Sequence, residues 1–281
     1  MLRIARDGDL PAIDAYLAER ADTCMFLRSN LRAAGLRWDG GRYQAQYALA
    51  WDGDAVVGVI GHAWNGMLLI QSDAPVAALV TEVVRHSGRT VAGFSGPIEQ
   101  VRTAREALGL AEARAQLDDD ETLMALALDR LVIPPALARG AVRARPGTAS
   151  DRATIAGWRA AYLVELNGSP PGAETESAAA RWFDAALAET NLWVAEHDGA
   201  PVALTSFNAR LPDRVQVGGV FTPPALRGRG YARAVVAASL LDARAAGVDR
   251  AILFTPRADA LAAYRAIGFE TIGRYGIVLL A

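Results

Sequence analysis

Cysteine is almost absent from this chain of 281 residues, which contains Cys24 alone and therefore no intrachain disulfide. This cysteine usage is typical of a reducing compartment, and we expect a cytoplasmic protein. Long hydrophobic runs are also missing: no segment of about 18 apolar residues occurs, so we expect no transmembrane helix. The first residues, Met1 to Asp7, lack the hydrophobic core of a secretory signal, so we expect no such leader.

An excess of charge of either sign is missing as well. The chain has 29 basic and 31 acidic residues and a net charge of −2, which gives no reason to expect nucleic acid or an anionic membrane as a partner. Its three histidines are widely spaced and form no metal-ligand pattern with Cys24, so no metal site is expected. With 52% hydrophobic and 21% charged residues, the sequence describes a globular protein long enough for two domains.

The most informative stretch is Arg227-Gly228-Arg229-Gly230-Tyr231-Ala232. It follows an apolar segment, residues 215–221, and opens an alanine-rich helix expected over residues 232–246. A strand, a glycine-containing loop and a helix N-terminus in this order favour an anion site. Glycines let backbone N–H groups approach a phosphate, and the helix dipole favours its negative charge.

Other phosphate-binding motifs fit this stretch less well. A P-loop would end in Gly-Lys-Ser/Thr, and no such triplet follows. A dinucleotide-binding fingerprint needs a third glycine where this chain has Arg233. The alternative interpretation assigns no function to this stretch, which would then be a basic, solvated loop that merely starts a helix.

A second motif lies further along the chain. Residues 250–255 predict a strand that ends before Pro256, and residues 258–267 predict a helix with Gly268 as its C′ residue. The pattern Ala260-x-x-x-Tyr264-x-x-x-Gly268-Phe269 and the earlier Arg227-x-x-Gly230-x-Ala232 together resemble the two signatures of the GNAT N-acetyltransferases. This resemblance covers about residues 142–281.

The resemblance implies acetyl-CoA as cosubstrate and a direct transfer of its acetyl group to an amine. In that family, the strand before the glycine loop stabilises the thioester carbonyl, and the tandem Gly218-Gly219 predicts a bulge there. The resemblance implies that Tyr264 is the catalytic general acid that protonates the leaving thiolate; without function it would be a core aromatic. The implied cofactor-binding residues are Val220, Phe221, Thr222, Arg227, Gly228, Arg229, Gly230, Tyr231 and Ala232.

The two halves of the chain share the same order of elements. Each begins with a short strand pattern followed by an Asp, Asp9 or Asp151, and a helix. Each continues with a hairpin signal, at Asp52-Gly53 and at Asp198-Gly199. We therefore expect an α/β protein of two tandem GNAT-like folds, each a central twisted mixed sheet flanked by helices, with domains at 1–135 and 141–281.

The first half lacks the glycine loop. We assign its cofactor position to the junction after a strand at residues 90–93, where Gly96 is the only glycine and Pro97 removes an N–H donor. Glu99 and Glu106 stand in place of the arginines. We interpret this half as a degenerate copy that is structural or shapes the acceptor pocket.

The carboxylates of the chain do not identify a general base. Glu165, Glu196, Glu174 and Glu176 are candidates, and a base acting through water is equally compatible with the sequence. The run Asp118 to Glu121 is interpreted as a solvated turn before a strand at residues 122–128, with a metal or cationic substrate as the minor alternative.

The function expected from these features is transfer of an acetyl group from acetyl-CoA to a primary amine, most simply that of a small molecule. One alternative is a non-catalytic acyl-CoA-binding or sensor module. Others are enzymes similar to mycothiol synthase, whose acceptor is the amine of a thiol-sugar precursor, and enzymes that transfer aminoacyl groups from tRNA. The tRNA alternative predicts a broad basic surface, which the charge balance does not indicate. The acceptor and the oligomeric state are not determined by the sequence.

Overall fold

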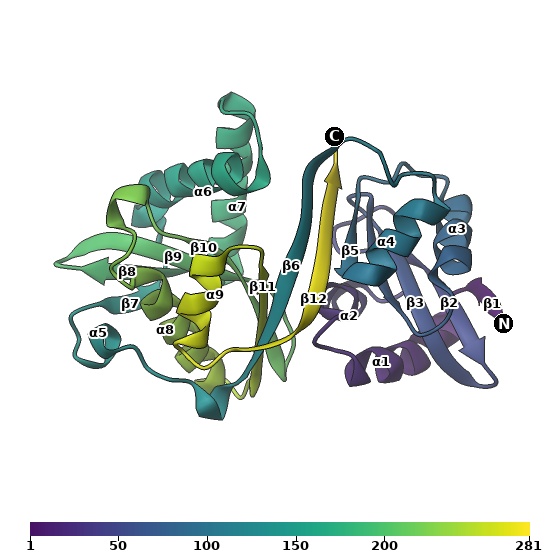
Figure 1. Ribbon diagram of the computed structural model, residues 1–281, viewed down its shortest axis with the longest axis horizontal. Coiled ribbons are helices and arrows are strands. Elements are labelled where there is room, and N and C mark those ends of the chain that lie inside the picture. Colours follow the sequence, from purple (N-terminus) through teal and green to yellow (C-terminus); the bar gives the residue numbers. More distant parts are fainter. The chain divides into compact units, whose positions relative to one another are not determined.

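The computed structural model describes residues 1–281, which divide into two compact units (Figure 1). Unit 1 comprises Met1–Thr122 and Gly273–Ala281, and unit 2 comprises Leu123–Ile272. This division differs from the expected domains 1–135 and 141–281. The reason is that the last strand of the sequence completes unit 1, and part of the strand that ends the first half belongs to unit 2.

Unit 1 is a mixed sheet in the order β1-β2-β3-β4-β5-β12. Its last two strands pair antiparallel, with Tyr275 opposite Pro97 and Leu279 opposite Gly93. The elements of the unit, with β6 and β12 given at full length, are β1 (Leu2–Ile4), α1 (Leu10–Glu19), α2 (Met25–Ala34), β2 (Ala45–Asp52), β3 (Ala55–Ala63), β4 (Met67–Ser72), α3 (Val76–Ser87), β5 (Gly93–Pro97), α4 (Ile98–Ala107), β6 (Ala115–Ala127) and β12 (Glu270–Leu280).

In unit 2, strands of mixed direction have the order β6-β11-β10-β9-β8-β7. The predicted hairpin forms between β8 and β9, and both turn residues, Asp198 and Gly199, have positive φ, as in the turns that match the twist of paired strands. The further elements of the unit are α5 (Pro135–Ala138), β7 (Arg143–Pro146), α6 (Arg152–Asn167), α7 (Ala173–Ala188), β8 (Trp193–His197), β9 (Ala200–Arg210), β10 (Arg214–Phe221), α8 (Tyr231–Ala245), β11 (Arg250–Thr255) and α9 (Ala258–Arg265).

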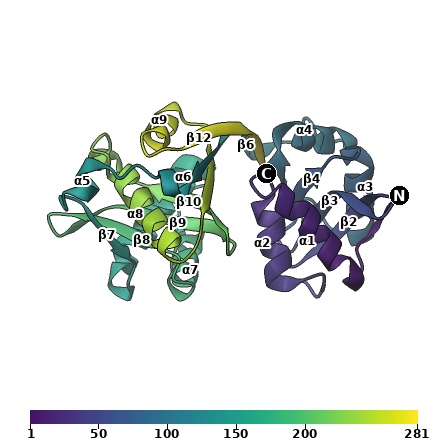
Figure 2. The ribbon, with the colours of Figure 1, turned by 90° about the horizontal axis from the view of Figure 1, so that it is seen from below.

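Helices cover both faces of each sheet because neighbouring strand residues point to opposite faces. In unit 1, Leu49 joins the core under α1 and α2, whereas Ala48 joins the core under α3 and α4 (Figure 2). In unit 2, Ala195 packs with α8 and α9, whereas Val194 packs with α6 and α7. The expected fold of a central sheet flanked by helices is confirmed.

The repeat of the two halves extends to side-chain contacts. Arg145 donates to both oxygens of Asp151, at 2.8 and 2.9 Å, and Asp151 also accepts from the backbone N–H of Thr148 at 2.7 Å. Arg3 and Asp9 are likewise six residues apart, and Arg3 Nη2 donates to Asp9 Oδ1 at 2.6 Å. Each aspartate thereby fixes the turn that leads from the first strand of its half into the first helix.

Element order also corrects the position assigned to the degenerate loop. The strand–helix pair β10–α8 corresponds in the first half to β4–α3, and β11–α9 corresponds to β5–α4. The junction at Gly96-Pro97 is therefore the counterpart of β11–α9. The true counterpart of the glycine loop is Asp73-Ala74-Pro75, which has no glycine.

The acidic run is part of a strand rather than a turn, contrary to expectation. β6 begins at Ala115 and contains Asp118 to Glu121. Asp118 pairs with Arg105 at 2.8 Å and Asp120 with Arg274 at 2.7 Å, so both neutralise arginines of unit 1. Glu121 is buried, and burial raises the pKa of its carboxyl to about 8.

None of the helices combines the length and apolar character that crossing a bilayer requires.

Candidate functional site

The pairing of β10 with β11 stops halfway along both strands. The parallel ladder joins Arg214–Gln216 of β10 to Arg250–Ile252 of β11 and ends there. β10 continues to Phe221 and β11 to Thr255. The last five residues of β10, which include Val220 and Phe221, therefore form no ladder with β11.

A bulge in β10 lies at the same place, as the tandem glycines predict. The register with β9 shifts between Gly218 and Phe221, and Gly219 has φ +59°. A Cβ on Gly218 would lie 2.1 Å from the amide of Asn208, and one on Gly219 would lie 2.8 Å from Ser206 Oγ. The positive φ of Gly219 favours glycine there, whereas at Gly218 an added side chain would have to displace the exposed side chain of Asn208.

The glycine loop joins β10 to α8 and ends in left-handed backbone. Gly228 has φ +77° and Gly230 φ +81°, and α8 begins at Tyr231, one residue earlier than expected. Backbone N–H groups of Gly228 to Ala232 donate to no other group of the chain. Unpaired amides at the positive end of a helix dipole, next to glycines, fit a phosphate group.

The two arginines of the motif differ in their contacts. Arg227 Nη2 lies 2.7 Å from Glu165 Oε2, and its Nε donates to Thr222 O at 3.0 Å. Arg229 is exposed and forms no ion pair. Arg229 is thus the cation available to a bound phosphate, whereas Arg227 is shared with a carboxylate of α6.

The other residues expected at the site divide between the end of β10 and the core. Thr222 Oγ1 is buried without a hydrogen-bond partner, which leaves a polar atom at the end of the strand for a ligand. Val220 is half-buried. Phe221 and Tyr231 are buried, so their contribution to a ligand would come from the backbone. Ala232 lies in the first turn of α8.

Tyr264 lies on α9, in the core that packs on α8. It is 8% exposed, and its ring lies 5.9 Å from that of Phe269. Both signature motifs therefore contribute residues to one apolar cluster, which contains Tyr231, Tyr264 and Phe269. This burial agrees with the packing role, and the catalytic role remains a prediction.

Two of the candidate bases, Glu165 and Glu196, are engaged in ion pairs. Arg227 and Arg257 both contact Glu165, and they hold the pKa of that carboxyl below its usual range. Glu196 lies 2.7 Å from Arg145. Glu174 and Glu176 are exposed in the first turn of α7, where acids stabilise the helix dipole.

A side chain that the sequence analysis missed, Arg159 of α6, lies against the bulge. Its Nη1 is 3.7 Å from the position that a Cβ on Gly219 would occupy. The spacing of Ile155, Arg159 and Tyr162 marks one helix face, and an arginine among apolar residues on that face was the signal available in the sequence.

The corresponding place in unit 1 is closed. A Cβ on Gly96 of β5 would lie 2.7 Å from Ile70 O of β4, so the two strands stay in contact. The amides of Asp73 and Ala74 both donate to Val57 O, at 2.9 and 3.2 Å. The loop of unit 1 has neither the glycines nor the free amides of its counterpart.

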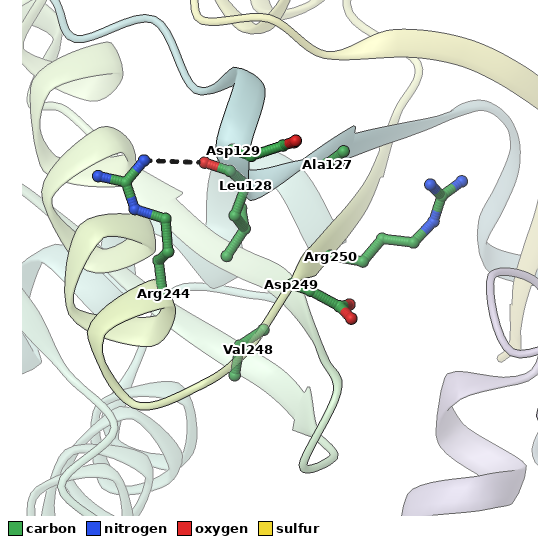
Figure 3. A pocket seen from close by; sticks show the side chains of 7 residues that line it. All are labelled: Ala127, Leu128, Asp129, Arg244, Val248, Asp249 and Arg250. Carbon is green, nitrogen blue, oxygen red and sulfur yellow. Dashed lines mark hydrogen bonds between the residues drawn. The ribbon is translucent and has the colours of Figure 1, made fainter.

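A pocket of about 450 Å³ lies at the other end of α8 (Figure 3). It is lined by Ala127, Leu128, Asp129, Arg244, Val248, Asp249 and Arg250. Arg244 Nη1 donates to Leu128 O at 3.1 Å, which ties the helix to the segment after β6. A helix of 15 residues is about 22 Å long at about 1.5 Å per residue, so this pocket is remote from the glycine loop.

No group of three or more His, Cys, Asp and Glu side chains is arranged to hold a metal ion.

Comparison with known proteins identifies the fold and a family that part of the chain resembles. Residues 158–269, which include β10, the glycine loop and α9, match the acetyltransferase (GNAT) family. This part of unit 2 is therefore similar to the GNAT acetyltransferases. No curated protein matches it.

Solved structures of GNAT proteins resemble the chain over nearly its whole length. A GCN5-related N-acetyltransferase from Sphaerobacter thermophilus is 18% identical, with 99% of this chain and 94% of that chain covered and a TM-score of 0.58. A tandem GNAT protein from the clavulanic acid biosynthesis pathway is 15% identical, with 99% and 98% covered and a TM-score of 0.54. A GNAT-family acetyltransferase from Colwellia psychrerythraea is 14% identical, with both chains covered completely and a TM-score of 0.54. At these identities the likeness concerns the fold.

Proposed function

We propose that the protein is an N-acetyltransferase that moves the acetyl group of acetyl-CoA directly to a primary amine of a small molecule. The observation that carries the proposal is the end of the β10–β11 ladder beside the glycine loop, in unit 2 alone. The similarity of residues 158–269 to GNAT acetyltransferases supports acyl transfer in general. The choice of acetyl-CoA rests on the fit of the loop to a diphosphate and on the signature residues.

Bound acetyl-CoA would supply an activated acetyl thioester. The amides of Gly228 to Ala232 would bind its diphosphate, with Arg229 as the nearby cation. The backbone of Val220 to Thr222, which does not pair with β11, would hold the pantetheine arm. It would donate hydrogen bonds to the thioester oxygen as negative charge develops there.

The transfer forms a bond between the amine nitrogen and the acetyl carbon and breaks the bond from that carbon to sulfur. The nitrogen loses a proton to water, since Glu165, the carboxylate beside the glycine loop, is paired with Arg227 and Arg257. Tyr264 donates its hydroxyl proton to the departing thiolate and regains one from solvent. In water, tyrosine has a pKa of about 10 and a thiol of about 8.5, so proton transfer between such groups is only modestly uphill.

The site residues of this proposal all belong to unit 2, and the closed loop of unit 1 predicts one cofactor site per chain. Balanced charge gives no support for nucleic acid or a membrane as a partner. The single cysteine supports a cytoplasmic location.

The proposal is tested by incubating purified full-length protein with acetyl-CoA and a panel of small amines. Release of free thiol and acetylated product in equal amounts is expected for at least one amine. Binding of CoA without turnover for every amine would identify a sensor module instead. Thiol release without an acetylated amine would indicate hydrolysis and contradict the proposal.

A further inference from the structure

Arg159 is a partly buried cation that has no carboxylate partner. Other arginines of unit 2 are paired: Arg145 with Asp151, Arg152 with Asp184 and Arg227 with Glu165, all at 2.7 to 2.8 Å. Arg159 makes no such contact. Its Nε is buried and donates no hydrogen bond. A buried charge without a counter-ion is costly, and a bound anion would offset this cost.

Aromatic rings hold the guanidinium in place. The Arg159 Cζ atom lies 4.5 Å from the ring centroid of Tyr162 and 4.6 Å from that of Trp182. The Tyr162 hydroxyl also accepts a hydrogen bond from the guanidinium, but neither this neutral group nor the rings neutralise its charge as a carboxylate would. Burial lowers the pKa of Arg159, and Tyr162 opposes this effect only in part. The guanidinium stays charged because its ordinary pKa is so high.

The acids closest to this cluster in sequence are already committed. Asp184, two residues after Trp182, binds Arg152 through both carboxylate oxygens, at 2.8 and 2.9 Å. Glu165 is held between Arg227 and Arg257. The remaining acids of these two helices, Glu174 and Glu176, are exposed in the first turn of α7 and form no ion pair with Arg159.

The guanidinium lies where the acceptor would react. Gly219 forms the bulge of β10, and a Cβ there would be 3.7 Å from both Arg159 Nη1 and Trp182 Cζ2. The backbone after this bulge is the segment that the proposed function assigns to the thioester. An anion bound by Arg159 would thus lie a few bonds from the reacting carbon, while the diphosphate would lie beyond Thr222.

We infer that Arg159 binds a carboxylate of the acceptor, so that the substrate class is amines bearing a carboxylate close to the amino group, as in amino acids. This inference rests on the proposed function and extends it to the acceptor. Arginine suits the task because its planar fork matches both carboxylate oxygens. Trp182 and Tyr162 would flank the bound acid and exclude water from the ion pair.

The test compares matched acceptors on the full-length protein: glycine, β-alanine and γ-aminobutyrate, each beside its primary amide. We expect kcat/KM for the best acid to exceed that of its amide by about 10- to 100-fold, the range of a charged hydrogen-bonded pair. The chain length of the best acid then gives the spacing between amine and carboxylate. Equal values for every acid and its amide would overturn the inference and leave the proposed function standing.

Variants separate this role from a purely structural one. Arg159→Gln should raise KM for the acid by about 10- to 100-fold and leave the amide and CoA affinity unchanged, and Arg159→Lys should retain part of the preference. Arg152→Gln, on the exposed side of the same helix, is the control and should leave KM unchanged for both the acid and the amide. Loss of acid and amide turnover in equal proportion would contradict the inference.

If Arg159→Gln does not fold, the comparison of acids with amides on the unaltered protein still decides whether the inference holds. No turnover of any amine would overturn the proposed function and this inference together.

Discussion

Glu165 Oε2 lies 2.7 Å from Arg227 Nη2, so the first arginine of the Arg-x-x-Gly-x-Ala motif is paired with a carboxylate of α6. Both side chains are about one-third exposed, which limits the strength of the pair. The carboxylate also places a negative charge near the amides that we assign to a diphosphate. Glu165 therefore opposes the phosphate both directly and by occupying Arg227.

Glu165→Gln should tighten CoA binding by up to about fivefold, because a surface pair of this kind is worth up to about 1 kcal/mol. Calorimetry at low and high salt measures the change, which should shrink as salt screens the charges. Glu270→Gln, an exposed acid of β12, is the control and should leave the dissociation constant unchanged. Weaker CoA binding by Glu165→Gln would show that the ion pair orders the loop for the ligand.

The glycine loop offers a second test with a matched control. Gly228 and Gly247 both have positive φ, +77° and +91°, and a Cβ at either position would meet nothing within 4 Å. Alanine at either site should cost about 1 kcal/mol of stability through backbone strain. Only Gly228→Ala should weaken CoA binding, by at least about tenfold, since its methyl group would stand where the diphosphate approaches. Equal CoA affinity of the two variants, measured by calorimetry, would remove the loop from the site.

Local signals in the sequence predicted most of unit 2 correctly. β11 has the expected bounds, and α8 begins within one residue of expectation, because glycines and prolines mark these ends. The bulge at Gly218-Gly219 followed from the same logic. Tandem GNAT-like folds followed from the repeated order of strand, helix and hairpin.

Features that depend on distant residues were predicted wrongly or missed. The strand partner of residues 275–279 is β5, which lies far earlier in the sequence, and no local pattern specifies such a partner. The degenerate loop was placed one strand–helix pair too late because a shared order of elements does not reveal which junctions correspond. The acidic run was taken for a turn, since alternating burial along β6 is hidden when consecutive residues are all acidic. Arg159 was missed because its position in the site depends on Trp182 and Gly219, which lie elsewhere in the sequence.

The last strand should be essential to the stability of unit 1. Val278 is 1% exposed and packs with the residues of α3 and α4, and Tyr275 and Ser95 share a hydrogen bond of 3.0 Å. Val278→Ala should therefore lower the free energy of unfolding by about 2 kcal/mol, as expected for a truncated core side chain. Hydrogen exchange should show the loss of protection first in β5 and its neighbours. Unchanged protection of β5 in a chain ending at Ile272 would contradict the pairing.

The same topology predicts the behaviour of an isolated second half. A fragment of residues 141–281 lacks Leu123–Ala127, which belong to unit 2 and supply Met124 and Leu126 to its main core. We expect this fragment to unfold at a lower temperature than residues 123–272, which keep that part of β6. Thermal unfolding of the two fragments makes the comparison, and a higher melting temperature for 141–281 would show that β6 is dispensable.

Asp151 should make unit 2 sensitive to acid. Hydrogen bonds from Arg145, and further ones from Thr148, lower the pKa of Asp151 to about 2. Because the folded-state pKa is depressed, the stabilisation is complete above the unfolded value of ~3.9 and is lost as pH falls through about 2. Asp151→Asn should cost about 2 kcal/mol at neutral pH, and the difference from the unaltered protein should shrink between pH ~4 and ~2. A difference that stays constant over this range of pH, measured by chemical denaturation, would assign the loss to packing.

Tyr264→Phe tests the proposed proton donor. The substitution removes only the hydroxyl, so the contact with Phe269 and the position of α9 should persist, and CoA affinity should change little. Turnover should fall by about 10²- to 10⁴-fold, the usual contribution of general acid catalysis, under conditions in which chemistry limits the rate.

A suitable control for Tyr264→Phe is Tyr47→Phe in unit 1, whose buried hydroxyl has no hydrogen-bond partner. Removing that hydroxyl should change neither turnover nor CoA binding, and it relieves a buried polar group of its desolvation cost. A change of acetyl donor provides a further check. If Tyr264 protonates the leaving thiolate, a donor thioester whose thiol has a lower pKa should depend less on that proton. The defect of Tyr264→Phe should therefore be smaller with such an acetyl donor than with acetyl-CoA. An equal defect with both donors, or unchanged turnover with acetyl-CoA, would return Tyr264 to a packing role beside Phe269.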